Sequence, residues 1–374
     1  MSKLRVLLTG GGTGGHIYPL IAVTQELNNL AAENGRVLDA RYFGGAGEYY
    51  DVFINNGIRF ISVISSKIRR GSVLENLLDI PKFFLGLLQA LWKIYWFMPD
   101  VIFSKGGPGA LPIALAGKFY FVPIVIQESD TVPGKTNILS GKIAKKIFLA
   151  FKSAEGYFTG KNTEVSGNPV RSDLTGQNPA AAKQQLGFDV NLPLLLVLGG
   201  SQGATRLNAF ILENLQQLIR QFQILHQVGA GNYEEYKNEY NFIAKDWSEL
   251  ETRRYQFKPY LEENLASAYS AADLILARAG AGTIFELAAL GRPSVLVPLP
   301  EAAGDHQRKN AYEYAAAGAA VVIEQDNFAG NLAISQLSQL INNPDLLQKM
   351  SAAAKSFYRP DAAKIIARGI LECI

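Results

Sequence analysis

Apolar positions along the chain alternate between short continuous runs and longer stretches with helical spacing. Residues 4–8 form one such run and lead into glycines, after which apolar residues recur at Ile17, Leu20, Ile21 and Leu27. A short run is typical of a buried strand, and the later spacing is typical of an amphipathic helix. The N-terminus therefore predicts a strand, a glycine-rich loop and a helix in succession.

The same pattern returns in the second half of the chain. Residues 194–198 form an apolar run, glycines punctuate 199–203, and a helical pattern begins at Leu207. A second pair of segments also aligns, because DVIFSKGGPGALPIALAG from Asp100 matches DLILARAGAGTIFELAALG from Asp273. The chain therefore repeats its own organisation.

Each of these aligned segments is followed by a buried strand that contains proline, at 122–126 and 293–297. Two repeated pairs in the same order predict two Rossmann-like halves, each with a parallel sheet wrapped by helices. The expected fold class is therefore α/β, with two parallel sheets facing a deep cleft and ligands at the carboxyl ends of the strands.

The domain boundary is predicted within VSGNPVRSD, where Gly, Asn and Pro interrupt the pattern. We expect an N-terminal domain over 1–168 and a C-terminal domain over 169–355. The last segment, about 356–374, predicts a helix that packs back on the N-terminal domain. Its apolar stripe consists of Ala363, Ile366, Ile370 and Leu371.

Composition supports a compact α/β protein of two domains. The 374 residues are 48% hydrophobic and 18% charged, which leaves no room for extended disorder. The single cysteine, Cys373, excludes an internal disulfide and a Cys-based metal site. The formal net charge of +3 is small, so attraction to an anionic surface depends on local clusters of Lys and Arg.

The most apolar segment, 83–97, is interrupted by Gln89 and Lys93. It is shorter than the roughly 18 to 20 residues that span a bilayer. The N-terminus has neither the long apolar core nor the cleavage site of a signal peptide. We therefore expect a cytoplasmic protein without a transmembrane helix.

Both glycine loops place backbone N–H groups where a phosphate can approach the start of a helix, since glycine has no Cβ. Neither loop ends in the Lys-Ser/Thr of a P-loop, which disfavours nucleotide hydrolysis of that kind. Gly10, Gly12 and Gly15 also fit the GxGxxG pattern of a dinucleotide site, with Glu33 and Asp39 as loose candidates for its acidic residue. A nicotinamide-dependent oxidoreductase and purely structural glycines therefore stay open as alternatives.

Polar side chains lie beside these loops in the sequence. His16, in the first turn of the first helix, is placed to act as a general base. Glu286, one turn into a helix of the second half, can accept both hydroxyls of a ribose. His306, Gln307 and Asn310 suit sugar hydroxyls, and no ligand set with a recognisable metal spacing is evident. Each side chain also has an ordinary alternative role in a helix start or a solvated loop.

Taken together, GGTGGH, GNPVR, GGSQGA, RAGAGTIFELAALGRPSVLVP and DHQRKNA, in this order, closely resemble the MurG family of glycosyltransferases. The resemblance runs from Leu4 to the C-terminal helix. It implies the GT-B fold and transfer of N-acetylglucosamine from UDP-N-acetylglucosamine to the 4-hydroxyl of undecaprenyl-diphospho-N-acetylmuramyl-pentapeptide, with inversion. Domain 1–168 would then bind the acceptor and the membrane, and domain 169–355 would bind the UDP-sugar.

The resemblance also implies peptidoglycan synthesis at the cytoplasmic face of the plasma membrane. The implied partners are the nucleotide sugar, the undecaprenyl-linked acceptor, an anionic membrane surface and other cell-wall synthesis proteins. No metal, cofactor or nucleic acid is expected.

Site residues are implied by matching motifs. His16 would be the catalytic base, with Glu128 supporting it. The donor-binding residues would be Thr13, Gly14, Gly15, Arg171, Ser201, Gln202, Gly203, Leu261, Ala281, Gly282, Thr283, Glu286, His306, Gln307 and Asn310. The acceptor diphosphate would lie at Gly14, Gly15, Gly106 and Gly107.

Two positions depart from the family pattern. Many relatives read HEQN where this chain reads QESD at 127–130, so Asp130 stands in place of an Asn credited with binding the donor sugar. His306 replaces a Gln found in some members, which makes Gln307 the firmer candidate of the two.

The resemblance favours a membrane-binding face between residues 64 and 97, where basic residues precede an aromatic-rich apolar helix. The residues expected to touch the membrane are Lys67, Arg69, Arg70, Phe84, Leu88, Trp92 and Trp96. The alternative is a helix packed wholly in the N-terminal core.

In the expected reaction His16 removes the proton of the acceptor hydroxyl as that oxygen attacks the anomeric carbon. UDP leaves with its charge held by loop amides, a helix N-terminus and Arg171. A rival is a GT-B enzyme with another lipid acceptor, such as diacylglycerol. A non-catalytic membrane-binding protein is disfavoured, because polar groups of both halves converge on one predicted cleft.

Overall fold

The computed structural model describes residues 2–374 except 46, 48, 66–72, 175–176, 201–202, 262–263 and 329, and the side chains of 73–78 and 172 also lie outside the description. The chain forms two compact units. Unit 1 comprises Met1–Arg171 and Arg359–Ile374, and unit 2 comprises Ser172–Tyr358. The divisions inferred from the sequence, at 168/169 and 355/356, lie close to these.

Unit 1 is built on a parallel sheet in which the strand order is β3-β2-β1-β4-β5-β6-β7. Its strands are β1 (Lys3–Thr9), β2 (Val37–Gly44), β3 (Arg59–Ser62), β4 (Val101–Ser104), β5 (Ile124–Glu128), β6 (Lys146–Leu149) and β7 (Thr163–Val165). The central strands β1 and β4 are buried almost throughout, which is typical of a sheet covered on both faces.

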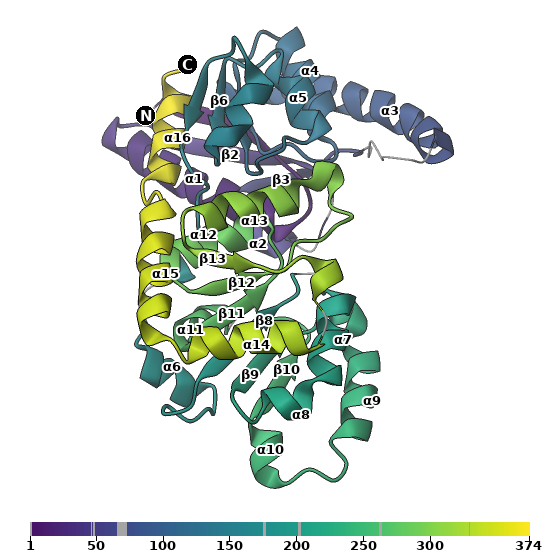
Figure 1. The fold of residues 1–374 in the computed structure, drawn as a ribbon. Coiled ribbons are helices and arrows are strands. Elements are labelled where there is room, and N and C mark those ends of the chain that lie inside the picture. The colour runs from purple at the N-terminus through teal and green to yellow at the C-terminus, as the bar shows by residue number, and fades with distance from the viewer. Residues whose placement is uncertain are drawn as a thin grey trace. The chain divides into compact units, whose positions relative to one another are not determined.

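Helices cover both faces of this sheet and form two apolar clusters with it (Figure 1). They are α1 (Gly14–Glu33), α2 (Tyr50–Asn55), α3 (Val73–Phe97), α4 (Ala110–Phe119), α5 (Lys135–Gly141), the 3-10 helix η1 (Lys152–Phe158) and α16 (Ala362–Leu371). The C-terminal helix α16 packs against α1 and buries Ile366 and Ile370 in the core of unit 1.

Unit 2 has a parallel sheet with the order β10-β9-β8-β11-β12-β13. Its strands are β8 (Leu194–Leu198), β9 (Gln223–Gln227), β10 (Tyr255–Lys258), β11 (Leu274–Ala277), β12 (Ser294–Leu296) and β13 (Ala320–Val322). Its α-helices are α6 (Pro179–Gln185), α7 (Thr205–Glu213), α8 (Leu215–Leu218), α9 (Tyr233–Ile243), α10 (Glu249–Arg253), α11 (Leu265–Ala271), α12 (Ala281–Leu290), α13 (His306–Ala316), α14 (Gly330–Ile341) and α15 (Pro344–Phe357). Its 3-10 helices are η2 (Ser172–Leu174), η3 (Ala230–Asn232), η4 (Ala303–Asp305) and η5 (Gln325–Asn327).

The two sheets share one topology, because β8 to β13 repeat the order of β1 to β6. A specific hydrogen bond is repeated as well. Asp100, just before β4, accepts from the Arg5 amide at 2.8 Å, and Asp273, just before β11, accepts from the Leu194 amide at 2.8 Å. The predicted duplication and the prediction of two parallel-sheet Rossmann-like domains are therefore confirmed.

Candidate functional site

Four loops of this structure lie where ligands bind in open α/β sheets. In each unit the strand order reverses between the first strand and the fourth, β1 and β4 in unit 1 and β8 and β11 in unit 2. Loops that follow such strands form a crevice at the carboxyl edge of the sheet. The glycine-rich segments identified in the sequence are the loops after these four strands.

The loop after β1 presents His16 at the start of α1. Thr13 precedes the helix, and its hydroxyl Oγ1 lies 2.9 Å from His16 Nδ1. Gly14 and Gly15 are the first two residues of α1, so their N–H groups have no acceptor one turn earlier within the helix. This end of unit 1 can therefore hold an anion beside an imidazole.

The loop after β4 packs directly on the loop after β1. Gly106 and Gly107 have φ angles of 74° and 83°, in the left-handed region that favours glycine. A Cβ on Gly107 would lie 2.7 Å from the Cα of Gly11, so the two backbones approach too closely for a side chain. The structure thus brings both predicted acceptor-side loops together.

Glu128 ends β5 and is buried within its own loop. Its carboxylate accepts from the Asp130 amide and the Asn137 side chain at 2.9 Å each, and from the Gly134 amide at 3.2 Å. Burial, and then the neighbouring Asp130, raise the pKa of Glu128 above its ordinary value. These contacts make Glu128 a support of the 128–134 loop, and its predicted support of His16 stays a prediction.

Arg171, the last residue of this part of unit 1, lies over the aromatic ring of Tyr18. Its guanidinium carbon is 4.4 Å from the ring centroid, and Tyr18 is on α1 two residues after His16. The cation–π contact fixes the guanidinium beside the first turn of α1. Arg171 therefore lies near the Gly14 and Gly15 end of that helix.

In unit 2 the loop after β8 leads into α7. Ser201 and Gln202 lie outside the described residues, so their predicted contacts stay predictions. Gly203 has a φ of 78°, and a Cβ there would collide with the Val228 carbonyl and the Asn232 side chain. Gln227, at the end of β9, donates to the Gly200 carbonyl at 3.0 Å and thereby fixes the loop.

Glu286 lies on α12, which begins at Ala281 directly after the loop that follows β11. Gly282 and Thr283 complete the predicted set at the start of this helix. Tyr269, which is buried on α11, donates its hydroxyl to Glu286 Oε2 at 2.7 Å. The carboxylate predicted to bind a ribose is therefore held in one orientation.

The remaining predicted donor residues take part in loop contacts of unit 2. Asn310 donates to the Ala279 carbonyl at 3.3 Å, which ties α13 to the loop after β11. Gln307 Oε1 accepts from the Leu299 amide at 3.0 Å, and His306 Nδ1 lies 2.8 Å from the Ala303 carbonyl. The Leu261 amide donates to Gln227 Oε1 at 3.2 Å.

Sequence reasoning missed several side chains that shape these loops. Lys105, Gln127 and Asn168 form a buried polar cluster in unit 1, and Tyr269 holds Glu286 in unit 2. One signal was present for Lys105, because the aligned repeats put it opposite Arg278. Tyr269 and Asn168 carry no comparable local signal.

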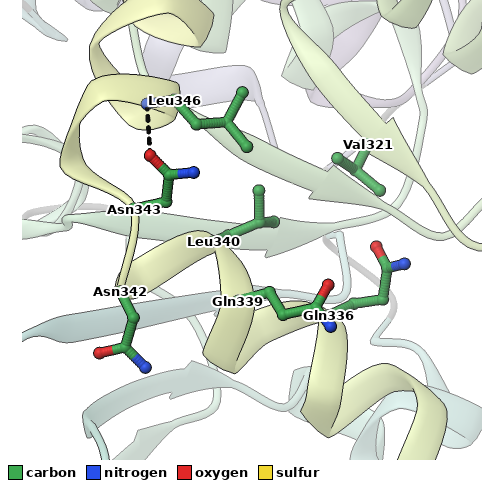
Figure 2. Close-up of a pocket in the computed structure, with 7 residues that line it drawn as sticks. All are labelled: Val321, Gln336, Gln339, Leu340, Asn342, Asn343 and Leu346. Atoms are coloured by element: carbon green, nitrogen blue, oxygen red, sulfur yellow. Dashed lines mark hydrogen bonds between the residues drawn. The ribbon is translucent and has the colours of Figure 1, made fainter.

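A separate pocket of unit 2 is lined mainly by carboxamides (Figure 2). Its residues come from β13, α14, α15 and the turn between these helices, and they are Val321, Gln336, Gln339, Leu340, Asn342, Asn343 and Leu346. Asn343 Oδ1 accepts from the Leu346 amide at 3.1 Å, which caps α15. No predicted site residue lines this pocket.

Comparisons with known proteins agree with this arrangement. The glycosyltransferase family 28 N-terminal domain matches residues 6–149, and the family 28 C-terminal domain matches residues 194–366. A solved structure of Acinetobacter baumannii MurG has a TM-score of 0.72 at 27% identity, covering 100% of both chains. The UDP-GlcNAc 2-epimerase of Neisseria meningitidis, bound to UDP-GlcNAc, has a TM-score of 0.67 at 15% identity, covering 100% of both chains, which shows the fold alone.

These matches define the class: the chain is a two-domain glycosyltransferase with the GT-B fold. Two curated relatives carry the name UDP-N-acetylglucosamine–N-acetylmuramyl-(pentapeptide) pyrophosphoryl-undecaprenol N-acetylglucosamine transferase. The one from Natranaerobius thermophilus is 33% identical over 99% of this chain and 100% of its own length. The one from Chlorobium luteolum is 34% identical over 99% of each. The chain belongs to this family, the MurG family.

Proposed function

We propose that this protein transfers N-acetylglucosamine from UDP-N-acetylglucosamine to the 4-hydroxyl of undecaprenyl-diphospho-N-acetylmuramyl-pentapeptide, with inversion, in peptidoglycan synthesis. The observation that carries the proposal is the similarity to transferases of that name over nearly the whole chain. Membership of a glycosyltransferase family argues against the alternative of a nicotinamide-dependent oxidoreductase. The loops after β1 and β8, which hold the same place in their sheets, also fit a transferase with one site for the donor and one for the acceptor.

His16 is assigned as the base through its Nε2 atom. Because Thr13 Oγ1 lies 2.9 Å from Nδ1, the hydroxyl oxygen can accept a hydrogen bond from Nδ1–H. Nε2 then carries the lone pair in this tautomer. Nε2 takes the proton of the acceptor hydroxyl while that oxygen forms a bond to the anomeric carbon. The bond from this carbon to the diphosphate oxygen breaks, and UDP leaves with the electron pair.

The donor is assigned to the loops after β8 and β11. The starts of α7 and α12 offer N–H groups to the diphosphate. Glu286, oriented by Tyr269, accepts from the ribose, and His306 and Gln307 face the sugar. The buried Asn310 supports the loop after β11 beneath this site. Unit 1 then binds the acceptor at Gly106 and Gly107.

Membrane contact is assigned to one face of α3. Phe84, Leu88, Trp92 and Trp96 are each more than half exposed, whereas Ala90 and Ile94 on the opposite face are buried. Such a helix lies in the interface of a membrane with its apolar face inserted. Among the described residues, no helix has the length and apolar character needed to cross a bilayer.

The basic residues predicted for this face, Lys67, Arg69 and Arg70, lie outside the described residues. Further candidates are found nearby in unit 1. The ring of Tyr95 on α3 lies 6.3 Å from that of Tyr120, which is flanked by the exposed Phe119 and Phe121. A hollow of about 650 Å³ beside Phe121 is lined by Lys118, Lys142 and Lys145, among other residues. We assign this region to the cytoplasmic face of the plasma membrane, beside anionic lipid.

The proposal is tested by transfer of labelled N-acetylglucosamine to defined acceptors in detergent. We expect a product with the undecaprenyl-diphospho-muramyl-pentapeptide acceptor, inverted at the anomeric carbon. Transfer to diacylglycerol alone would identify the rival lipid transferase. Transfer to neither acceptor would refute the proposal.

A further inference from the structure

Both units bury a cation directly after the central strand that precedes a predicted binding loop. Lys105 follows β4 and is 2% exposed, and Arg278 follows β11 and is 8% exposed. The two strands hold the same place in their sheets, so the two cations are structurally equivalent. The duplication has therefore kept a positive side chain at this position.

The hydrogen bonds of Lys105 all go to neutral oxygens. Its ammonium donates to Ser129 Oγ at 2.5 Å, to Asn168 Oδ1 at 3.0 Å and to Gln127 Oε1. Arg278 is similar, since it donates to the carbonyls of Val297 and Pro298 and to Gln325. Neither cation has a carboxylate among these partners.

A buried charge that hydrogen-bonds only to neutral groups is unfavourable, and an apolar side chain of similar size would usually be no less stable there. Burial lowers the pKa of Lys105 to about 7, while the nearby Glu128 and Asp130 raise it. An anion bound close to the ammonium would favour the charged form further. Lys105 is therefore better explained by a ligand than by packing.

The position of Lys105 points to the glycine loops of unit 1. Its amide donates to the Thr9 carbonyl at 2.9 Å, and the next two residues are Gly106 and Gly107. A Cβ on Gly10 would lie 3.4 Å from the Lys105 Cβ, so the side chain starts beneath the loop after β1. In a buried setting a charge acts on its neighbours far more strongly than in water.

We propose that Lys105 is a positioning residue that supplies positive potential beneath the two glycine loops of unit 1, and that it thereby selects an acceptor carrying a diphosphate linkage. The inference rests on the proposed function and assigns Lys105 a part in it. The lysine acts through its electrostatic field and not by touching the reacting atoms. The contacts to Ser129 and Asn168 hold the ammonium in place for this role.

The test compares two soluble acceptors that differ only in the linkage. One is a short-chain prenyl diphosphate linked to N-acetylmuramyl-peptide, and the other has a neutral linker in place of the diphosphate. In Lys105→Met we expect kcat/KM for the diphosphate acceptor to fall by about ten- to a hundredfold, mainly through the acceptor KM. The neutral acceptor and the KM of the nucleotide sugar should change little.

Further variants separate charge from damage to the fold. Lys105→Arg keeps the charge and should retain the preference for the diphosphate acceptor, whereas Lys105→Gln should lose it. Arg278→Met removes the equivalent cation of unit 2 and should leave the acceptor preference unchanged. If Lys105→Met does not fold, the Gln and Arg pair still decides the question.

An equal loss with both acceptors would overturn the inference, because a structural role affects both alike. A higher donor KM with an unchanged acceptor preference would also overturn it, since the cation would then serve UDP. If the wild-type enzyme transfers sugar to neither acceptor, the proposed function itself fails, and this result is distinguishable from the other two.

Discussion

The contact between Thr13 and His16 sets the chemistry available at the start of α1. Oγ1 and Nδ1 are 2.9 Å apart, so the Thr13 hydroxyl can hydrogen-bond to Nδ1 of His16. The other ring nitrogen, Nε2, then stays available for the hydroxyl of the acceptor substrate. We expect His16→Ala to lower kcat by about two to four orders of magnitude while UDP affinity is retained. Steady-state kinetics and calorimetric titration with UDP measure the two quantities.

Thr13→Val is the matched variant for this prediction, since it removes only the hydroxyl. It should cause a smaller loss of kcat than His16→Ala. Near-normal turnover of the alanine variant would exclude His16 as the base.

The buried hydroxyl of Tyr269 is expected to matter for nucleotide recognition. Tyr269→Phe removes a hydrogen bond to the Glu286 carboxylate, and bonds to charged groups contribute more than neutral ones. We expect the KM for UDP-N-acetylglucosamine to rise about tenfold, and the preference for UDP over 2′-deoxy-UDP to fall. Competition assays with the two diphosphates measure this preference.

Tyr312→Phe is the control for that experiment. The Tyr312 hydroxyl donates to Glu324 at 2.8 Å on the exposed surface of unit 2, so its loss removes a similar bond elsewhere. Equal effects of the two variants would contradict a specific role for Tyr269.

At this scale the sequence predicts side chains in the first two turns of a helix that follows a strand and a loop. His16, Glu286 and Asn310 are of this kind. Lys105, Gln127 and Asn168 meet only because β4, β5 and the segment after β7 are brought together by the sheet. Contacts of such long sequence separation leave no local pattern.

Among the elements, α3 carries the clearest expectation for the membrane. We expect the double substitution Leu88→Asp and Trp92→Asp to abolish flotation with anionic liposomes, because charge replaces apolar surface that would otherwise insert. UDP affinity should persist, since the donor loops are assigned to unit 2.

Phe242→Asp provides the control for α3, because Phe242 is a strongly exposed aromatic residue of unit 2. It should leave flotation intact. Flotation of the α3 variant at wild-type levels would show that this face does not bind lipid.

Element bounds were predicted well where apolar runs are regular, as in β8 at Leu194–Leu198. The strand predicted at 122–126 is instead β5, Ile124–Glu128. Pro123 has no N–H to give to a ladder, whereas the polar Gln127 and Glu128 stay within the strand and are buried. The sequence predicts a loop at such a polar strand end, because the apolar run stops at Ile126.

Across the whole molecule, the two units should respond to acid in opposite ways. His226 of unit 2 is fully buried between Tyr255 and Asn208, and burial lowers its pKa to about 3. Between about pH 6.5 and 3 the unfolded chain binds a proton that the folded unit does not. The free energy of unfolding of unit 2 should therefore decrease as the pH falls through this range. The decrease due to His226 approaches about 1.4 kcal/mol per pH unit.

Glu128 of unit 1 should change the stability of its unit in the opposite direction as the pH falls. Its pKa is raised, so the folded unit binds a proton more readily than the unfolded chain and gains stability as the pH falls from neutral towards the ordinary pKa of a carboxyl. We expect a change from pH 7 to pH 5 to lower the urea midpoint of unit 2 and to raise that of unit 1.

The fluorescence of Trp247 can measure the unfolding of unit 2, because this residue packs on the core of that unit. The centroid of its ring is 6.1 Å from that of Tyr240. With Trp92 and Trp96 replaced by Phe, its fluorescence follows unit 2 alone, since the chain has three tryptophans. A urea midpoint for unit 2 that is the same at pH 7 and pH 5 would contradict the prediction, and His226→Gln should flatten the dependence.

The return of α16 to unit 1 sets an order of events during synthesis on the ribosome. The core of unit 1 includes Ile366 and Ile370, which are translated after every residue of unit 2. Unit 2 is continuous in the chain, so all of its residues leave the ribosome before those of α16 do. Unit 1 contains both the first residues to be synthesised and residues that follow all of unit 2. The apolar face of α1 therefore stays uncovered until α16 packs on it. The nascent protein thus gains its assigned donor half before its assigned acceptor half.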